Sequence, residues 1–194
     1  MRSDKEMEWK TLETKYLFKR NWLTAKVEKV ELPDGRIYDE YYTLEYPTWI
    51  NVIAITKDGK MILERQWRHG LKIVSTEIPA GVVEKGENPM DAAKRELQEE
   101  TGFGGGTWTQ FLVTAPNPSV MNNLCYTYLA EGVELVSDTH LDATEDLEVF
   151  FRDKDEVYEM LRSGQFCQAL MLAPLWKFFC HTHVNCKTLT RITR

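Results

Sequence analysis

The sequence predicts an α/β protein in which strands predominate and a small N-terminal β subdomain precedes the main domain. Three observations indicate this class: two pairs of strand-like runs interrupted by turn sequences, one strongly capped helix in the first half, and shorter strand and helix patterns that alternate toward the C-terminus. The length of 194 residues suits one domain with an appendage.

The two hairpins come first along the chain. Residues 23–31 and 36–44 alternate loosely around Pro33-Asp34-Gly35, which has the turn chemistry of a β-hairpin. The following runs, 49–55 and 61–67, are rich in apolar and β-branched side chains and flank Asp58-Gly59. The first hairpin is therefore predicted to form the small subdomain, and the second to begin the main sheet.

The marked helix begins at Asn88-Pro89, because asparagine is a preferred N-cap and proline fits the first helical position. Good helix formers follow, with Met90, Ala93 and Leu97 in an apolar stripe, and Gly102 ends the helix. Further on, the pattern predicts strands at 111–113, 125–129 and 147–151, and helices at 154–162 and about 169–179.

The domain organisation follows from these elements. No repeat or flexible linker divides the chain, so we place one boundary near Pro47. Residues 1–46 are predicted to be a β-hairpin subdomain, residues 47–180 the main domain, and residues 181–194 a C-terminal tail.

Composition and charge exclude several classes of protein. The formal net charge of -6 argues against sequence-independent binding to nucleic acid, which requires clustered lysine and arginine. No apolar stretch approaches the roughly 20 residues that cross a membrane, and no apolar segment follows the early charges as in a secretory signal. We therefore expect a cytoplasmic protein with no membrane and no nucleic acid among its partners.

Cysteine usage fits that compartment. Cys125, Cys167, Cys180 and Cys186 are few and irregularly spaced, which predicts reduced thiols and no disulfide framework. The tail segment 180–186 holds two cysteines and two histidines, but one short segment is poorly suited to close a zinc tetrahedron. We interpret it as a frayed terminus.

The predicted helix carries an acidic face. Glu96, Glu99 and Glu100 stand at i, i+3 and i+4, where like charges repel by roughly 0.2–0.5 kcal/mol per pair. A solvated surface is the ordinary explanation of such a run. The alternative is a bound cation, and carboxylate oxygens without histidine or cysteine favour Mg²⁺ over Zn²⁺.

The spacing of this segment decides between the two explanations. Residues 81–103 match the pattern G-x5-E-x7-R-E-U-x-E-E-x-G-U, in which U is aliphatic or aromatic, and an accidental match has a probability on the order of one in a million. The segment resembles the motif of the Nudix hydrolases. Its matching residues are Gly81, Glu87, Arg95, Glu96, Leu97, Glu99, Glu100, Gly102 and Phe103.

The resemblance implies the Nudix fold, a mixed β-sheet sandwiched between helices, and a Mg²⁺ cofactor with Mn²⁺ as the alternative. It implies that Glu96, Glu99 and Glu100 are metal ligands and that Ala80 makes a further metal contact. The glycine next to it, Gly81, would permit a close approach of the backbone to the metal. It also implies that Arg95 orients a carboxylate, for which Glu87 is the candidate. Glu99, Arg95 and Glu87 are thereby assigned to catalysis.

The flanks of the motif resemble the ADP-ribose pyrophosphatases within this family. Glu77-Ile78-Pro79-Ala80-Gly81 leads into the motif, Pro118 lies fifteen residues beyond Phe103, and Gln66-Trp67-Arg68 resembles a strand that sends an arginine to the substrate. Arg68, Glu77 and Pro118 are thus substrate-binding candidates. The alternative for Arg68 is a surface ion pair, and the alternative for Pro118 is a proline that only shapes the loop. The sequence also departs from those enzymes after Pro118, because Ser119 stands where they usually have glycine.

A later loop in those pyrophosphatases supplies acids to the site. Glu145 matches an acid that binds metal or takes part in catalysis, but Ala143 stands where the catalytic base is expected. Asp142, Glu145 or a glutamate of the motif could abstract the proton instead, so the base stays open at this stage.

A nucleobase needs a flat apolar partner, and Trp22, Trp49 and Trp67 are candidates. Burial in the core or in a subunit contact is the alternative for each. We rank Trp49 first.

The predicted reaction is hydrolysis of a nucleoside diphosphate derivative, with ADP-ribose giving AMP and ribose 5-phosphate. The alternatives are another nucleoside diphosphate sugar, a dinucleoside polyphosphate, NADH, or a Nudix protein that senses a nucleotide without turnover. A complete glutamate set favours an enzyme. The resemblance also implies a homodimer that exchanges its N-terminal strands.

Overall fold

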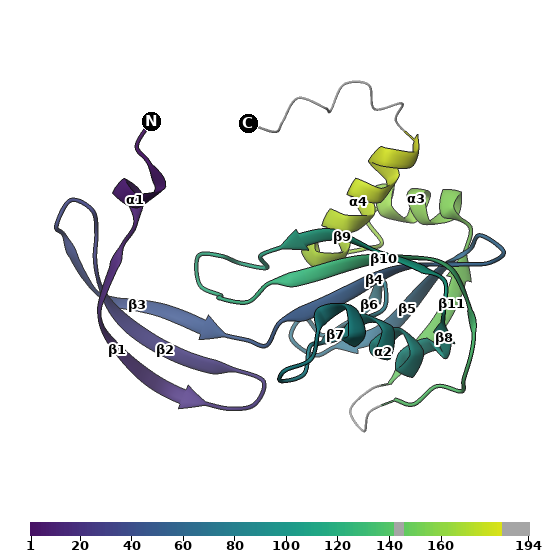
Figure 1. Cartoon of the computed structure of the whole chain (residues 1–194), viewed down its shortest axis with the longest axis horizontal. Helices are drawn as coiled ribbons and strands as arrows, with labels where there is room; N and C mark the ends of the chain where they lie inside the picture. Colours follow the sequence, from purple (N-terminus) through teal and green to yellow (C-terminus); the bar gives the residue numbers. More distant parts are fainter. Residues whose placement is uncertain (142–145, 184–194) are drawn as a thin grey trace. The chain divides into compact units, whose positions relative to one another are not determined.

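The computed structural model describes residues 1–141 and 146–183 (Figure 1). The larger of its two compact units comprises residues 48–114 and the described residues from 125 onward. A sheet runs through this unit in the order β11-β5-β4-β10-β8, with β6 beside β5, β7 beside β4 and β9 beside β10. Its strands are β4 (Trp49–Thr56), β5 (Met61–Arg68), β6 (Ile73–Glu77), β7 (Ala80–Val82), β8 (Phe103–Gly104), β9 (Thr107–Thr114), β10 (Cys125–Leu135) and β11 (Leu147–Arg152).

The sheet is mixed, because β10 runs parallel to β4 while the other strand pairs are antiparallel. Strands β4 and β5 are paired at Ile55 and Met61, next to the turn that joins them. Farther from the turn, β4 pairs with β7 and β5 pairs with β6. The two strands therefore diverge, and the opening between them is where the functional side chains gather.

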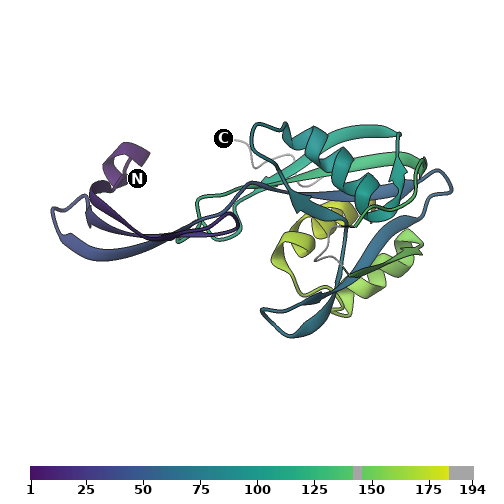
Figure 2. The same ribbon diagram turned by 90° about the horizontal axis from the view of Figure 1, so that it is seen from below.

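Helices cover both faces of the sheet. Helix α2 (Pro89–Thr101) lies on one side, and α3 (Lys154–Arg162) and α4 (Ala169–His183) lie on the other (Figure 2). Strand β4 is buried on both faces: Ile50 and Val52 pack in the cluster that contains Leu97 of α2, whereas Ile53 packs in the cluster that contains Leu175 of α4. This alternation follows the two-residue period of a strand.

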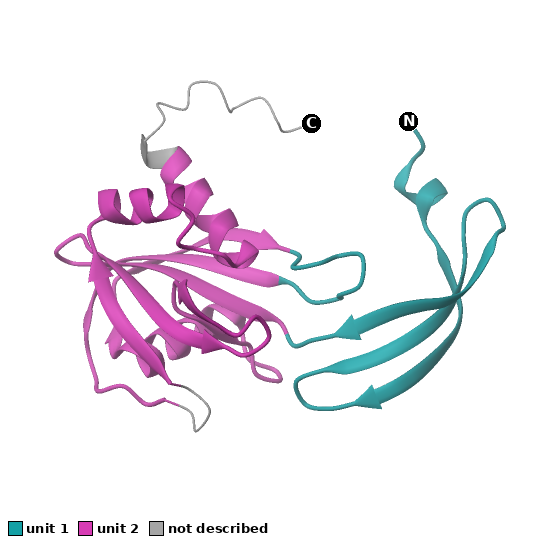
Figure 3. Cartoon of the chain, turned by 180° about the vertical axis from the view of Figure 1, so that it is seen from behind, with its two compact units in different colours: residues 1–47, 115–124 teal, residues 48–114, 125–194 magenta. Residues whose placement is uncertain are grey.

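The smaller unit comprises residues 1–47 and 115–124 (Figure 3). It contains α1 (Asp4–Met7) and an antiparallel sheet in the order β1-β2-β3, formed by β1 (Lys10–Lys19), β2 (Thr24–Glu31) and β3 (Ile37–Glu45). Segment 115–124, which the sequence places in the main domain, joins this unit through a parallel bridge between Leu44 and Met121. The Leu44 N–H also donates to the Val120 carbonyl at 2.7 Å.

The fold class predicted from the sequence is confirmed, and most predicted elements lie within a few residues of their observed bounds. The N-terminal hairpin has a third strand, β1, which the sequence pattern does not predict. All ten residues of β1 are exposed, so it lacks the one-sided apolar alternation that marks a half-buried strand. It is held in the sheet by antiparallel pairing with β2, the next strand along the chain. Within residues 1–141 and 146–183, no helix is both long and apolar enough to cross a membrane.

Candidate active site

Helix α2 carries the acidic part of the motif and is held at both ends as its sequence predicts. The Asn88 side chain accepts a hydrogen bond from the Met90 N–H at 2.9 Å, and Gly102 ends the helix with a φ of 76°. The apolar residues that anchor it against the sheet are Ala92, Ala93 and Leu97. With this face fixed, the helix also buries Glu96 and Glu100, which are 9% and 2% exposed.

Backbone N–H groups of β7 donate hydrogen bonds to these two carboxylates. The Ala80 N–H donates to Glu100 Oε2 at 3.1 Å, and the Val82 N–H donates to Glu96 Oε1 at 3.2 Å. Between them, a Cβ at Gly81 would overlap the Glu96 carboxylate. Glycine is therefore required at this position because a carboxylate, rather than a side chain of residue 81, fills the space.

Arg95 connects the acidic groups of the motif. Its Nε and Nη2 donate to the two oxygens of Glu87, both at 3.0 Å, in a bidentate arrangement. Its Nη1 lies 2.9 Å from Glu99 Oε2 and 3.0 Å from Glu96 Oε1, and its Nη2 also donates to the Val82 carbonyl at 3.0 Å. The structure thus brings Arg95 and Glu87 together, as the sequence predicts, and ties them to the backbone of β7.

Burial and neighbouring charges shift the pKa values of the two glutamates Glu96 and Glu87 in opposite directions. Burial raises the pKa of Glu96, although Arg95 opposes that shift. The hydrogen bond from Arg95 lowers the pKa of Glu87. The Arg95 guanidinium has a raised pKa, chiefly from its hydrogen bond to Glu87. Arg95 therefore remains a cation that partly offsets a concentration of negative charge.

The donor set fits a hard divalent cation by its chemistry. Glu96 and Glu100 are buried carboxylates one helical turn apart, and Glu99 is partly exposed beside them. Among the side chains that the structure describes, no group of three acidic, histidine or cysteine residues is gathered around one point. The carboxylates are held instead by backbone N–H groups and by Arg95.

A second charged group lies on β5 and β6. Arg68 donates through Nε to Glu77 Oε1 at 2.9 Å, and through Nη2 to the other oxygen of this completely buried glutamate. Glu64, also completely buried, is the cross-strand neighbour of Glu77. The hydrogen bond to Glu77 raises the pKa of Arg68, and the charges of Glu77, Glu100 and Glu64 add to that effect. The glutamate of this ion pair is thus completely buried. The pair therefore differs from the surface ion pair that the sequence also allowed for Arg68.

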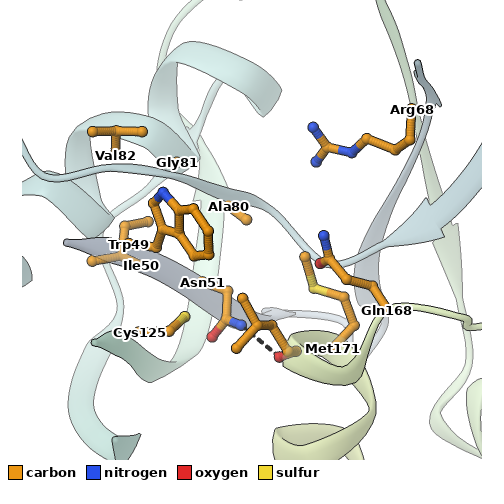
Figure 4. A pocket seen from close by; sticks show the side chains of 11 residues that line it. Trp49, Ile50, Asn51, Arg68, Ala80, Gly81, Val82, Cys125, Gln168 and Met171 are labelled. Carbon is orange, nitrogen blue, oxygen red and sulfur yellow. Dashed lines mark hydrogen bonds between the residues drawn. The ribbon is translucent and has the colours of Figure 1, made fainter. Parts of the chain in front are cut away.

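A cavity of about 280 Å³ opens between the diverging strands (Figure 4). Trp49 stands on one side of it and Arg68 on another, while Gln168 and Met171 of the α4 region approach from a third (Figure 4). Ala80, Gly81 and Val82 of β7 also line it. The cavity and the carboxylates of α2 therefore share one strand as their common wall.

The other predicted substrate contacts lie elsewhere. Trp67 is 53% exposed and its Nε1 faces His69, while Trp22 is 68% exposed in the smaller unit. Pro118 lies in a turn of the smaller unit, whereas the residues lining the cavity all belong to the larger one. Among the three tryptophans, Trp49 is the one that borders the cavity.

The later loop lies outside the described residues at the positions that matter for catalysis. These are the candidate acids Asp142 and Glu145, and Ala143, which stands where the catalytic base is expected. The same holds for residues 184–186 of the tail segment.

Sequence reasoning missed three polar residues of this region. Asn51 interrupts the apolar run of β4 and is 1% exposed, and Glu64 interrupts that of β5 and is fully buried. A polar residue within a strand buried on both faces is a signal that could have found these two. Gln168, before α4, carries no comparable signal in the sequence.

Comparison with known proteins agrees with this geometry. A model described as the NUDIX domain matches residues 46–168, and one described as the nucleoside diphosphate sugar hydrolase N-terminal domain matches residues 9–44. The ADP-ribose pyrophosphatase of Bacillus subtilis is 31% identical over 166 residues, which cover 85% of this chain and 89% of that protein. The methanol dehydrogenase activator of Bacillus methanolicus is 31% identical over 159 residues, covering 81% and 85%.

A solved structure described as an ADP compounds hydrolase superposes with a TM-score of 0.76 at 21% identity, covering 91% of this chain and 96% of that chain. This likeness shows the fold. Together with the domain match over residues 46–168 and the relatives above 30% identity, the complete motif on α2 means that the chain belongs to the Nudix hydrolases.

Proposed function

We propose that the protein hydrolyses the pyrophosphate bond of ADP-ribose to AMP and ribose 5-phosphate, with Mg²⁺ as its cofactor and Mn²⁺ as the alternative. One observation carries the proposal: Glu96 and Glu100 are buried against the backbone of β7, and the same strand lines a cavity that Arg68 and Trp49 also border. The similarity to the Bacillus subtilis ADP-ribose pyrophosphatase supports this choice of substrate.

The metal would be held by Glu96, Glu99 and Glu100, with contributions from the backbone at Ala80 and from Glu145. When bound, Mg²⁺ polarises phosphoryl oxygens and lowers the pKa of a coordinated water. The role of Gly81 is to let the Glu96 carboxylate lie against the chain.

Arg95 and Glu87 position these acids. The bidentate contact with Glu87 fixes the guanidinium plane, which directs Nη1 toward Glu99 and Glu96. Glu99 is 41% exposed in its side chain and is the most exposed of the four glutamates that the motif specifies, so we assign it, together with Glu145, to proton abstraction from the attacking water.

The substrate would be bound by Arg68, with Glu77 holding the guanidinium in place and Trp49 offering a flat apolar wall. Pro118 is proposed as a substrate contact on the resemblance to the ADP-ribose pyrophosphatases alone. These assignments leave the pyrophosphate near β7, where the cavity and the carboxylates adjoin the same backbone.

Purified protein tests the proposal with a panel of ADP-ribose, other nucleoside diphosphate sugars, dinucleoside polyphosphates and NADH. We expect ADP-ribose to be hydrolysed fastest with Mg²⁺, AMP and ribose 5-phosphate to be the products, and a chelator to stop the reaction. Chromatography with phosphate analysis identifies the products, and ¹⁸O water shows which phosphorus is attacked. Intact compounds throughout the panel, with both Mg²⁺ and Mn²⁺, would refute hydrolysis, and calorimetric binding without turnover would then indicate a sensor.

We also propose that the protein is a homodimer in which the smaller unit contacts a second copy. Two of its strands carry large apolar or aromatic residues that are each more than one third exposed, and a concentration of such residues is unusual for a free surface. These residues are Leu12, Tyr16, Leu17 and Phe18 of β1 and Ile37, Tyr38 and Tyr42 of β3. Light scattering at micromolar concentration is expected to give the mass of two chains, and the mass of one chain at every concentration would contradict the proposal.

A further inference from the structure

Two residues that line the cavity each carry a side-chain acceptor atom without a hydrogen-bond partner. Asn51 is 1% exposed and its Oδ1 is buried, and Gln168 Oε1 is likewise buried; neither atom accepts a hydrogen bond from the part of the chain that the structure describes. Both residues line the cavity. Because a buried acceptor without a donor costs about 1–3 kcal/mol, a ligand that donates hydrogen bonds is the natural means of satisfying them.

The orientation of the Asn51 amide is determined by its surroundings. Its Nδ2 donates to the Leu170 carbonyl at 2.8 Å (Figure 4). A reversed amide would place two acceptors against each other, so Oδ1 must be the atom directed away from Leu170. The unpartnered acceptor is therefore a consequence of the packing of α4 against β4.

The remaining groups around the cavity have complementary chemistry. Arg68 contributes N–H donors, while Trp49 contributes an apolar ring face (Figure 4). The Gln168 amide points toward the space that these two side chains border (Figure 4). A group that both donates and accepts hydrogen bonds, and has an apolar ring face as well, matches this set, and a sugar with several hydroxyl groups is such a group.

The position of the cavity indicates which part of the substrate enters it. Ala80 and Val82 line the cavity, and their N–H groups hold the carboxylates of Glu100 and Glu96. With the diphosphate placed at these carboxylates by the proposed function, the cavity would receive the group that is attached directly to the diphosphate, whereas a nucleobase is separated from the diphosphate by its own ribose. A volume of about 280 Å³ is just below the roughly 300–1,000 Å³ of pockets for drug-sized ligands, so it suits one ring.

We propose that Asn51 and Gln168 determine specificity for the sugar on the far side of the diphosphate, by accepting hydrogen bonds from its hydroxyl groups. This inference rests on the proposed function, since it assumes a diphosphate at β7. Trp49 then packs against the sugar ring rather than stacking on the base.

The test compares two diphosphate diesters, ADP-ribose and adenosine 5′-(methyl diphosphate), which carry the same nucleoside but differ in the sugar. Gln168→Met keeps the side-chain length and removes the acceptor. We expect it to lower kcat/KM for ADP-ribose about tenfold and to leave the methyl ester within about twofold. Gln168→Glu retains an acceptor oxygen and is expected to keep the wild-type ratio between the two substrates.

Gln165→Met is the matched control, because Gln165 is exposed, contacts Ser163 and does not line the cavity. It should leave both substrates unchanged. An unaltered ratio in Gln168→Met, or an equal loss on both substrates, overturns the inference. If wild-type protein hydrolyses neither compound, the proposed function fails, and calorimetric binding of the two compounds to wild type and Gln168→Met then tests the cavity separately.

Discussion

Replacing Glu100 with glutamine is expected to lower kcat for the preferred substrate on the order of 10³-fold while the protein stays folded. Glu100 is 2% exposed and accepts the Ala80 N–H through Oε2. Glutamine keeps the shape and can keep that hydrogen bond through its carbonyl oxygen, but it removes the negative charge that would attract a divalent cation. The loss should therefore appear in turnover rather than in stability.

Steady-state kinetics at saturating Mg²⁺, together with the midpoint of thermal unfolding, separates these effects. Asp91→Asn is the matched control, because Asp91 lies in the first turn of the same helix and is exposed to solvent. It should retain nearly full activity. A Glu100→Gln variant with more than about a tenth of wild-type kcat would show that Glu100 has no essential role in the reaction.

Replacing Gly81 with alanine is expected to lower activity by roughly 10²-fold and to destabilise the fold by about 1–3 kcal/mol. The new methyl group would occupy the space of the Glu96 carboxylate. Glu96 would have to leave the Val82 N–H and the Arg95 guanidinium, to which it is now close. The backbone itself should tolerate alanine, since Gly81 is not among the glycines with positive φ.

Gly70→Ala provides the control, because a Cβ there meets no atom within 4 Å and its φ is not positive. Denaturant unfolding and kcat measured on both variants should show effects at position 81 alone. A double variant with Glu96→Ala removes the overlap, so the stability loss at Gly81 should be smaller in that background. Additive losses would mean that the carboxylate is not what the methyl group displaces.

Local chemistry made α2 and its neighbours predictable. An asparagine cap, a proline in the first turn and a glycine after the last turn specify the helix bounds from a few adjacent residues, and the observed helix agrees. The contact between Arg95 and Glu87 could also be predicted, because the spacing of the motif restricts which carboxylate the arginine can contact. Strand β1 could not be predicted, because its ten exposed residues carry no one-sided pattern, although it forms a hairpin with β2, the next strand along the chain.

By itself, the sequence determined the family, the acidic helix face and the kind of cation that suits it, because each depends on residue types at short, fixed spacings. The tertiary structure decided what those residues touch. Arg68 pairs with buried Glu77 across two strands, Gly81 faces the Glu96 carboxylate, and Asn51 meets Leu170, 119 positions away along the chain. Such contacts depend on how β4 and β5 diverge and how α2 and α4 pack against them, which no local pattern encodes.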